Sequence, residues 1–133
     1  MYLVDTNVLS EARRGSNEAR TWLRSVDPST IYLSVVTLGE IMKGIALKRR
    51  TDARTAASLT VWLEQLRHDH SDWILPISDR VAFEWGRLAA ERPRSMADRL
   101  IAATAAIHDK IIVTRNVDDF GDTHIPVVNP WKR

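Results

Sequence analysis

The sequence predicts an α/β fold: a three-layer α/β/α domain in which helices flank a central parallel sheet of four to five short strands. Short apolar, β-prone runs alternate along the chain with stretches whose apolar residues recur every three or four positions. Such alternation is typical of a parallel sheet, because each strand regains its direction through a helix that packs on the sheet. With 133 residues, of which 44% are hydrophobic, the chain is long enough for one core. We therefore expect a single domain over residues 1–133.

Five β-prone runs are predicted as strands. The first ends abruptly at Asp5-Thr6-Asn7, residue types that favour turns and helix caps, so we expect a loop to follow it. The last run begins at Pro126 and is expected to be short. The five predicted strands are Tyr2–Val4, Ile31–Leu33, Trp73–Ile77, Ile111–Val113 and Pro126–Val128.

Helices are predicted between these runs from the spacing of apolar residues. In residues 35–48, Leu38, Ile41, Met42 and Ile45 repeat at three and four positions, which is the period of an amphipathic helix. Pro93 separates the last two predicted helices. The predicted helices cover a segment around Trp22 and residues 35–48, 52–70, 79–91 and 96–108.

Composition excludes several classes of function. The 19 Lys and Arg against 17 Asp and Glu give a net charge of only +2, so total charge alone does not indicate nucleic-acid binding. The absence of cysteine excludes disulfides, thiolate zinc sites, iron–sulfur clusters and a cysteine nucleophile. The chain has no run long and apolar enough for a membrane span and begins with no signal-like segment, so we expect a cytoplasmic protein without a membrane partner.

Four acidic residues, far apart in the sequence, are predicted to meet at one edge of the sheet. Asp5 ends the first strand, Glu40 lies early in the helix after the second, and Asp98 opens the helix that leads into the fourth. Asp119 lies in the segment that leaves the fourth strand. All four positions belong to the carboxyl edge of a parallel sheet, where ligands bind. Clustered carboxylates repel one another unless a cation lies among them, and oxygen ligands suit Mg²⁺ or Mn²⁺.

Each acid also has a local explanation that needs no shared site. Asp5 can cap the next helix, and Glu40 can be a solvated residue on a helix face. Asp98 follows Ser95 by three residues, which is the spacing of a capping box. Loop acids such as Asp119 are common in turns. These explanations do not predict that the four side chains share one edge.

Four segments resemble motifs of the PIN-domain family, specifically VapC-type toxins of type II toxin–antitoxin systems. They are LVDTNVLSE at 3–11, SVVTLGEIMKG at 34–44, SMADRLIAATAAI at 95–107 and IIVTRNVDDF at 111–120, and the chain ends in the Asn-Pro-Trp of some of these toxins. The resemblance implies a PIN-like α/β/α fold and a Mg²⁺- or Mn²⁺-dependent endoribonuclease. It also implies a homodimer, held inactive by a cognate VapB-like antitoxin in a hetero-oligomer.

The resemblance assigns roles by position. Asp5, Glu40 and Asp98 match three catalytic, metal-binding acids of the family, and Thr6 and Asn7 belong to its first motif. Thr114 matches a residue that orients the last loop. Many relatives have Asp directly after the Thr-Arg of the last motif, where this chain has Asn116. We assign the fourth acid to Asp119 and a supporting position to Asn116, and the choice between one and two metal ions stays open.

Basic residues next to the acid motifs are candidates for contact with RNA phosphates. Arg99 and Arg115 each adjoin a site motif, and Lys43 follows Glu40 by three positions. The four histidines have no spacing that predicts a catalytic or metal-binding role.

Two alternative functions compete with hydrolysis of RNA by a metal-activated water. A phosphatase with an Asp nucleophile typically carries a D-x-D pattern, but here Asp5-Thr6-Asn7 lacks the second acid. The other alternative is a catalytically weak PIN-like module that binds RNA or a protein partner.

Overall fold

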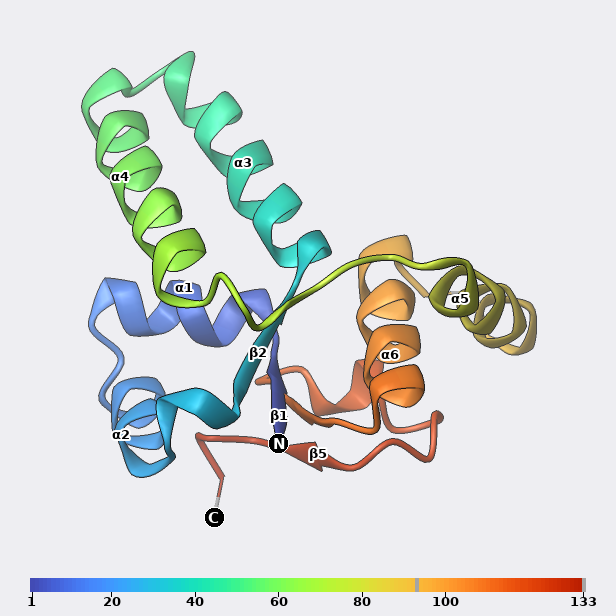
Figure 1. Ribbon diagram of the computed structural model, residues 1–133. Helices are drawn as coiled ribbons and strands as arrows, with labels where there is room; N and C mark the ends of the chain where they lie inside the picture. Colours follow the sequence, from blue (N-terminus) through green and yellow to red (C-terminus); the bar gives the residue numbers. More distant parts are fainter. Residues whose placement is uncertain (93, 133) are drawn as a thin grey trace.

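The computed structural model describes residues 1–92 and 94–132, so Pro93, predicted to separate two helices, lies outside the described residues. Its five strands form one sheet in the order β3-β2-β1-β4-β5, and every neighbouring pair is parallel. The five strands confirm the predicted fold class, in which helices flank a parallel sheet. Figure 1 shows this arrangement of helices around the sheet. The strands are β1 (Tyr2–Val4), β2 (Ile31–Ser34), β3 (Ile74–Leu75), β4 (Ile111–Val113) and β5 (Val127–Val128).

The strand order reverses at β1, the central strand. From β1 the chain builds β2 and β3 on one side, then crosses to place β4 and β5 on the other. Tyr2 of β1 pairs with Ile31 of β2 and with Ile111 of β4. In such sheets ligands bind at the carboxyl ends of the strands, at the point where the order reverses. The ends of β1 and β4 therefore mark the expected site.

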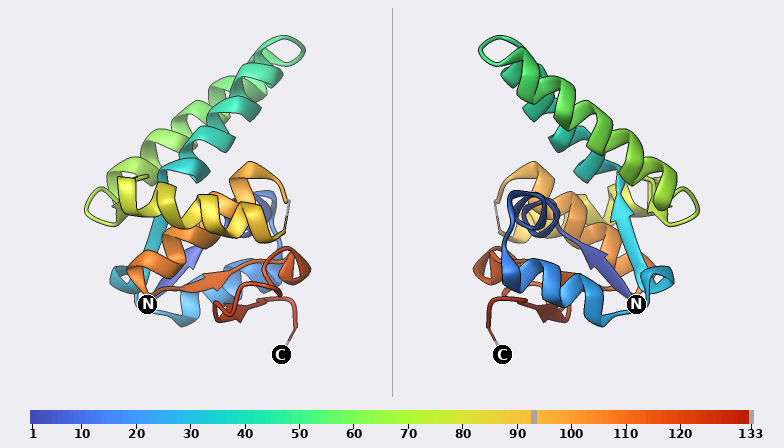
Figure 2. Two further views of the ribbon diagram at one scale, coloured as in Figure 1. Left: turned by 90° about the vertical axis from the view of Figure 1, so that its right-hand side faces the viewer. Right: turned by 90° about the vertical axis from the view of Figure 1, so that its left-hand side faces the viewer.

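In the part of the chain that the structure describes, six helices flank the sheet or project from it. In Figures 1 and 2, α1 and α2 cover one face and α5 and α6 the other, while the α3–α4 hairpin projects away from the sheet. In the described ranges 1–92 and 94–132, none of the helices has the length and apolar composition that crossing a bilayer requires. The helices are α1 (Thr6–Arg14), α2 (Asn17–Ser25), α3 (Val35–Arg49), α4 (Ala53–Asp69), α5 (Asp79–Glu91) and α6 (Met96–His108), and two short 3₁₀ turns are η1 (Pro28–Thr30) and η2 (Val117–Asp119).

The prediction of a loop after the first strand is wrong, because α1 begins directly at Thr6. Asp5 caps this helix: its carboxylate accepts the Thr6 N–H at 2.8 Å. Val8 and Leu9 are buried on its inner face. Gly15 ends α1 in the left-handed region at φ 105°, a conformation that costs glycine little. The polar run that suggested a loop is therefore a helix start.

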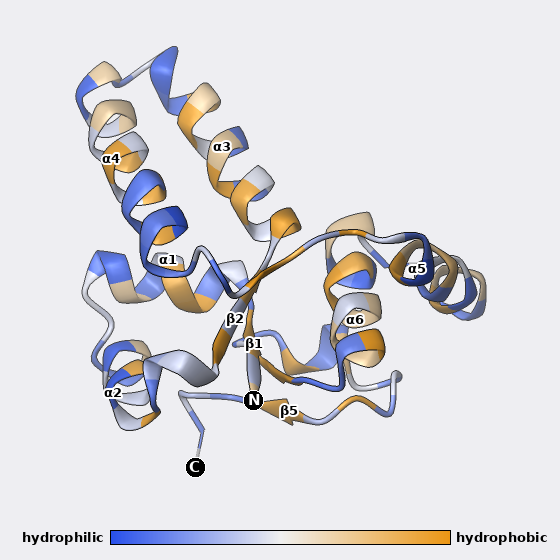
Figure 3. Cartoon of the chain, viewed as in Figure 1, coloured by the Kyte–Doolittle hydropathy of each residue, from blue (hydrophilic) through white to orange (hydrophobic). Residues whose placement is uncertain are grey.

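Side chains of the strands alternate between the two helical layers, as the pleat requires. Val4 packs with buried residues of α1 and α2, including Val8 and Ala19. Leu3 packs with Ile101 and other residues of α6 on the opposite face. A separate cluster joins α3 to α4, where Figure 3 shows hydrophobic residues on the facing sides of the two helices. The carboxyl edge of the sheet is thus held between two packed layers.

Candidate active site

Asp5 is the most restrained of the candidate acids. It is 5% exposed and stands at the end of β1, where it also caps α1. Its Oδ1 accepts the Thr6 N–H at 2.8 Å. Its Oδ2 accepts the Thr114 hydroxyl at 2.8 Å and the Asn7 side-chain amide at 3.2 Å. These three donors fix the carboxylate at the sheet edge.

The environment of Asp5 disfavours its charged form. Burial raises the pKa of Asp5 from its ordinary 3.8 to about 6, against the opposing effect of the Thr114 and Thr6 hydrogen bonds. The negative charges of Asp98 and Glu40 raise that pKa further. A buried carboxylate with two acidic neighbours is stabilised when a cation lies among them.

Asn7 and Thr114 join the end of β1 to the end of β4. The Thr114 hydroxyl is fully buried; it donates to Asp5 and accepts from the Asn116 N–H at 3.1 Å. The Asn7 amide donates to Thr114 at 3.3 Å, and its Oδ1 accepts the Arg115 N–H at 3.2 Å. The structure thus places the predicted supporting residues in one network around Asp5.

Glu40 approaches the same place from α3. The Thr6 hydroxyl lies 2.7 Å from Glu40 Oε1 and 3.0 Å from Thr37 Oγ1. One hydroxyl carries one proton, and a carboxylate is the stronger acceptor, so Thr6 donates to Glu40 and accepts from Thr37. Thr37 is fully buried and was not singled out from the sequence. Its position three residues before Glu40, on the same helix face, is the signal that could have found it.

Asp98 lies in the first turn of α6, where the capping box with Ser95 was predicted. Its N–H donates to the Ser95 hydroxyl at 3.1 Å, so Ser95 caps α6 as the spacing predicted. The carboxyl group is half-buried; burial raises its pKa, and the charge of Asp119 adds to the rise. The Ser95 hydroxyl also hydrogen-bonds the Asp98 carboxyl group, and this contact opposes the rise of its pKa.

One hollow of about 280 Å³ at the carboxyl edge collects the three acids. Among residues 1–92 and 94–132, no three Asp, Glu or His side chains stand close enough together to hold a metal ion as they are placed. The donor set is nevertheless all oxygen and mostly anionic, which fits Mg²⁺ or Mn²⁺ if the exposed Glu40 and the half-buried Asp98 turn toward Asp5. The residues that line the hollow are Asp5, Thr6, Asn7, Ser10, Glu11, Arg14, Glu40, Asp98 and Asn116.

Glu11 lines this hollow without having been predicted, and Arg14 lines it beside Glu11. They form an ion pair at 2.7 Å across one turn of α1. Glu11 lies four residues after Asn7, so the helical period would have placed both on one face had α1 been predicted. The missed helix therefore explains why Glu11 was missed.

Asp119 does not line the hollow that holds Asp5. It lines the adjoining one, and its carboxylate is 3.9 Å from the Arg94 guanidinium. Asn116 lines both hollows. For the fourth position, the structure thus brings the amide of Asn116 to the acids and leaves Asp119 beside them.

Arg99 is in the core, which contradicts its predicted contact with RNA. Its side chain is 1% exposed, and its Nη2 donates to the Asp119 carbonyl oxygen at 2.6 Å and to Asp122 Oδ1 at 3.1 Å. Arg99 precedes the buried Ala102 and Ala103 by three and four positions, so helical period alone places it on the inner face of α6. Arg99 therefore braces the segment that carries Asp119.

The other two basic candidates are exposed. Arg115 is 53% exposed; its guanidinium lies 4.9 Å from the centre of the Trp131 ring and 3.9 Å from Glu11 Oε2. Lys43 is exposed one turn after Glu40 on α3. Both remain available to an anionic ligand that reaches the acids.

The strand order and the acid-lined hollow at its reversal point define a doubly wound α/β protein with a candidate cation site. The PIN domain family model matches residues 2–124. The chain belongs to the PIN-domain family, so the resemblance seen in its motifs is confirmed.

Similar proteins carry names consistent with this family. Toxin FitB of Neisseria gonorrhoeae is 32% identical over 98% of this chain and 99% of its own, and the crystal structure of FitAcB from that organism matches all of both chains with a TM-score of 0.91. Ribonuclease VapC10 of Mycobacterium tuberculosis is 33% identical over 90% of this chain and 86% of its own. A toxin–antitoxin complex from Klebsiella pneumoniae is 30% identical over the full length of both chains, with a TM-score of 0.72.

Proposed function

We propose that this protein is a Mg²⁺- or Mn²⁺-dependent endoribonuclease toxin. The observation that carries the proposal is the convergence of Asp5, Glu40 and Asp98 from three elements into one hollow at the reversal point of the sheet. The similarity to a protein named as a ribonuclease supports RNA as the substrate.

Asp5, Glu40 and Asp98 would hold the divalent cation, with the Asn116 amide oxygen beside them. When bound, such a cation activates water and offsets the charge that develops on the phosphate. The chain's own residues prepare the site: Thr114 and Asn7 fix Asp5, and the Thr6 hydroxyl orients Glu40. Arg115 and Lys43 at the rim attract the RNA backbone.

The similar toxin–antitoxin complex supports a protein partner as well. We propose a cognate VapB-like antitoxin that inhibits the site, and a homodimer within a hetero-oligomer. An inhibitory segment with a basic side chain would neutralise the same clustered carboxylates as the cation does. We propose that the protein acts in the cytoplasm, where RNA is available as a substrate.

The purified protein is expected to cleave single-stranded RNA in the presence of Mg²⁺ or Mn²⁺. Addition of EDTA should stop this cleavage. Asp98→Asn removes one charge from the cation site, so kcat/KM should fall by about a hundredfold or more. Asp79→Asn, in the first turn of α5 and outside the hollow, is the matched control and should cleave normally. RNA binding without cleavage by the unmodified protein under either metal would favour the binding-module alternative.

Asp119→Asn tests which residue fills the fourth position. Because Asp119 lines only the neighbouring hollow and lies near Arg94, its loss should lower Mn²⁺ affinity and kcat/KM by only about tenfold, less than Asp98→Asn. Calorimetric titration of Mn²⁺ and RNA cleavage measure the two effects. An equal loss in both variants would make Asp119 a direct ligand.

A further inference from the structure

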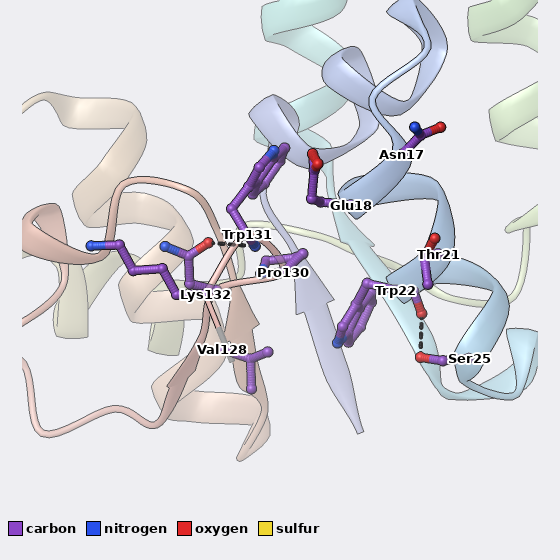
Figure 4. A pocket seen from close by; sticks show the side chains of 10 residues that line it. Asn17, Glu18, Thr21, Trp22, Ser25, Val128, Pro130, Trp131 and Lys132 are labelled. Carbon is purple, nitrogen blue, oxygen red and sulfur yellow. Dashed lines mark hydrogen bonds between the residues drawn. The ribbon is translucent and has the colours of Figure 1, made fainter.

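Two further hollows lie between the acid-lined hollow and the segment that follows β5. Asn116 lines both the acid-lined hollow and a second hollow of about 430 Å³. The second hollow shares three lining residues, Asn129, Trp131 and Lys132, with a third hollow of about 590 Å³ (Figure 4). Shared lining residues therefore place the three hollows next to one another, and we call the row that runs from the acids past Trp131 to α2 the trough.

Trp131 stands where the second and third hollows meet. Asn129 Oδ1 accepts the Trp131 N–H at 2.9 Å, which holds the backbone of this residue after β5. The Arg115 guanidinium lies 4.9 Å from the centre of its ring. The trough thus presents an aromatic plane paired with a cation, and Lys132 lies beside it.

We propose that this trough is a subsite for single-stranded RNA in which Trp131 stacks on a nucleobase and Arg115 and Lys132 contact the adjoining phosphates. The proposal rests on the proposed nuclease function. An RNA strand cut at the acids must extend away from them, and the neighbouring hollows of the trough offer it a route. Aromatic side chains next to basic groups are the usual means of holding single strands without reading their sequence.

The lining favours RNA over a protein partner here. The third hollow also contains Glu18, whose carboxylate repels phosphate but can accept hydrogen bonds from base amino groups. A base stacked on Trp131 presents such an edge. A different hollow, of about 460 Å³, leads from Thr6 and Glu40 into the α3–α4 hairpin and includes Ile41, Leu47, Leu59 and Trp62. That hollow also includes Arg14 and Lys48, so the choice of RNA for the trough rests on Trp131, Arg115 and Lys132.

Two substitutions of Trp131 separate stacking from packing, since this side chain also packs against the core. Trp131→Leu keeps apolar volume but removes the aromatic plane, and KM for a single-stranded RNA should rise about tenfold. Trp131→Phe retains a plane and should lose clearly less. Thermal unfolding of both variants checks that the fold is kept. Equal losses in both, or a KM for Trp131→Leu within twofold of the unmodified protein, would overturn the proposal.

Direct binding gives a readout that does not depend on cleavage. In the Asp98→Asn background, fluorescence anisotropy of a labelled RNA should show about tenfold weaker binding after Trp131→Leu. Lys132→Ala should lower the slope of log affinity against log salt concentration by about the amount that one phosphate contact contributes. Lys110→Ala is the matched control, because Lys110 precedes β4 at the opposite edge of the sheet and lies over Tyr32.

The outcomes distinguish the subsite from the nuclease. Binding that depends on Trp131 in a protein that cleaves nothing supports the subsite and contradicts the proposed function. Metal-dependent cleavage with RNA affinity unchanged by Trp131→Leu contradicts the subsite alone and leaves this surface to a protein partner. Equal effects of Lys132→Ala and Lys110→Ala on the slope of log affinity against log salt concentration would also contradict the subsite.

Discussion

Asp5→Asn is expected to abolish RNA cleavage while making the metal-free protein more stable at neutral pH. The amide removes one of the charges that a cation requires, so both Mn²⁺ affinity and kcat/KM should fall by about a hundredfold or more. The same change removes a buried negative charge whose neighbours are Asp98 and Glu40. Opposite effects on activity and stability are typical of a group kept for function at the expense of the fold.

The sign of the pH dependence follows from the raised pKa of Asp5. Between 3.8 and about 6 the folded protein keeps a proton on Asp5 that the unfolded chain has released, so stability falls as pH rises through this window. The difference between these two pKa values corresponds to about 3 kcal/mol in the free energy of unfolding. This stability is present below pH 4 and is lost above pH 6. Asp5→Asn should remove this loss.

Urea unfolding at several pH values, in EDTA, measures this effect. Asp27→Asn is the matched control, because Asp27 caps η1 and hydrogen bonds from Ser29 lower its pKa. The contribution of Asp27 to folding stability is therefore lost only as pH falls. Added Mn²⁺ should restore stability to the unmodified protein at pH 7 and not to Asp5→Asn. If stability depends on pH identically in the unmodified and Asp5→Asn proteins, Asp5 is not the carboxyl group whose raised pKa lowers stability at neutral pH.

The fold was predictable because its main signals are local. Apolar period distinguishes strands such as Ile111–Val113 from helices such as 96–108 without knowledge of their contacts. The start of α1 was missed because Asp5-Thr6-Asn7 serves equally as a turn and as a helix cap. Only packing of Val8 and Leu9 on the sheet decides between them, and that packing is a long-range contact.

The candidate site was predictable only in outline. The carboxyl-edge rule brings Asp5, Glu40 and Asp98 together from topology alone. It does not give side-chain directions, so it could not choose between Asn116 and Asp119 or recognise the hydroxyl of Thr37 under Thr6. Nor could proximity in sequence to Asp98 show that Arg99 points inward. Adjacent residues on a helix lie about 100° apart, so neighbours in sequence often face opposite environments.

Arg99→Met is expected to destabilise the protein strongly, by about 3 kcal/mol, because it breaks a buried ion pair and leaves Asp122 without its main partner. The Arg99 guanidinium is 1% exposed and donates at 3.1 Å to Asp122, whose side chain is 12% exposed. The same Nη2 holds the Asp119 carbonyl oxygen at 2.6 Å. Methionine fills much of the space but satisfies neither acceptor.

A double-mutant cycle separates the ion pair from the support of the loop. Asp122→Asn in the Arg99→Met background should recover part of the lost stability, because the uncompensated carboxylate is gone. The Asp119 carbonyl oxygen stays unpaired in both variants, so cleavage measured at low temperature, where the variants are folded, should stay reduced. Recovery of stability without recovery of cleavage is the signature of a residue that positions the segment beside Asp98.

Arg67→Met is the matched control for these variants. Arg67 also pairs with an acid, Glu64, at 3.1 Å, but both side chains are more than half exposed, so its loss should cost no more than about 0.5 kcal/mol. Burial, not the number of ion pairs, is what should separate the two arginines. If Arg99→Met costs as little as Arg67→Met in urea unfolding, water must replace the guanidinium at Asp119 and Asp122, and the brace between α6 and the last motif does not exist.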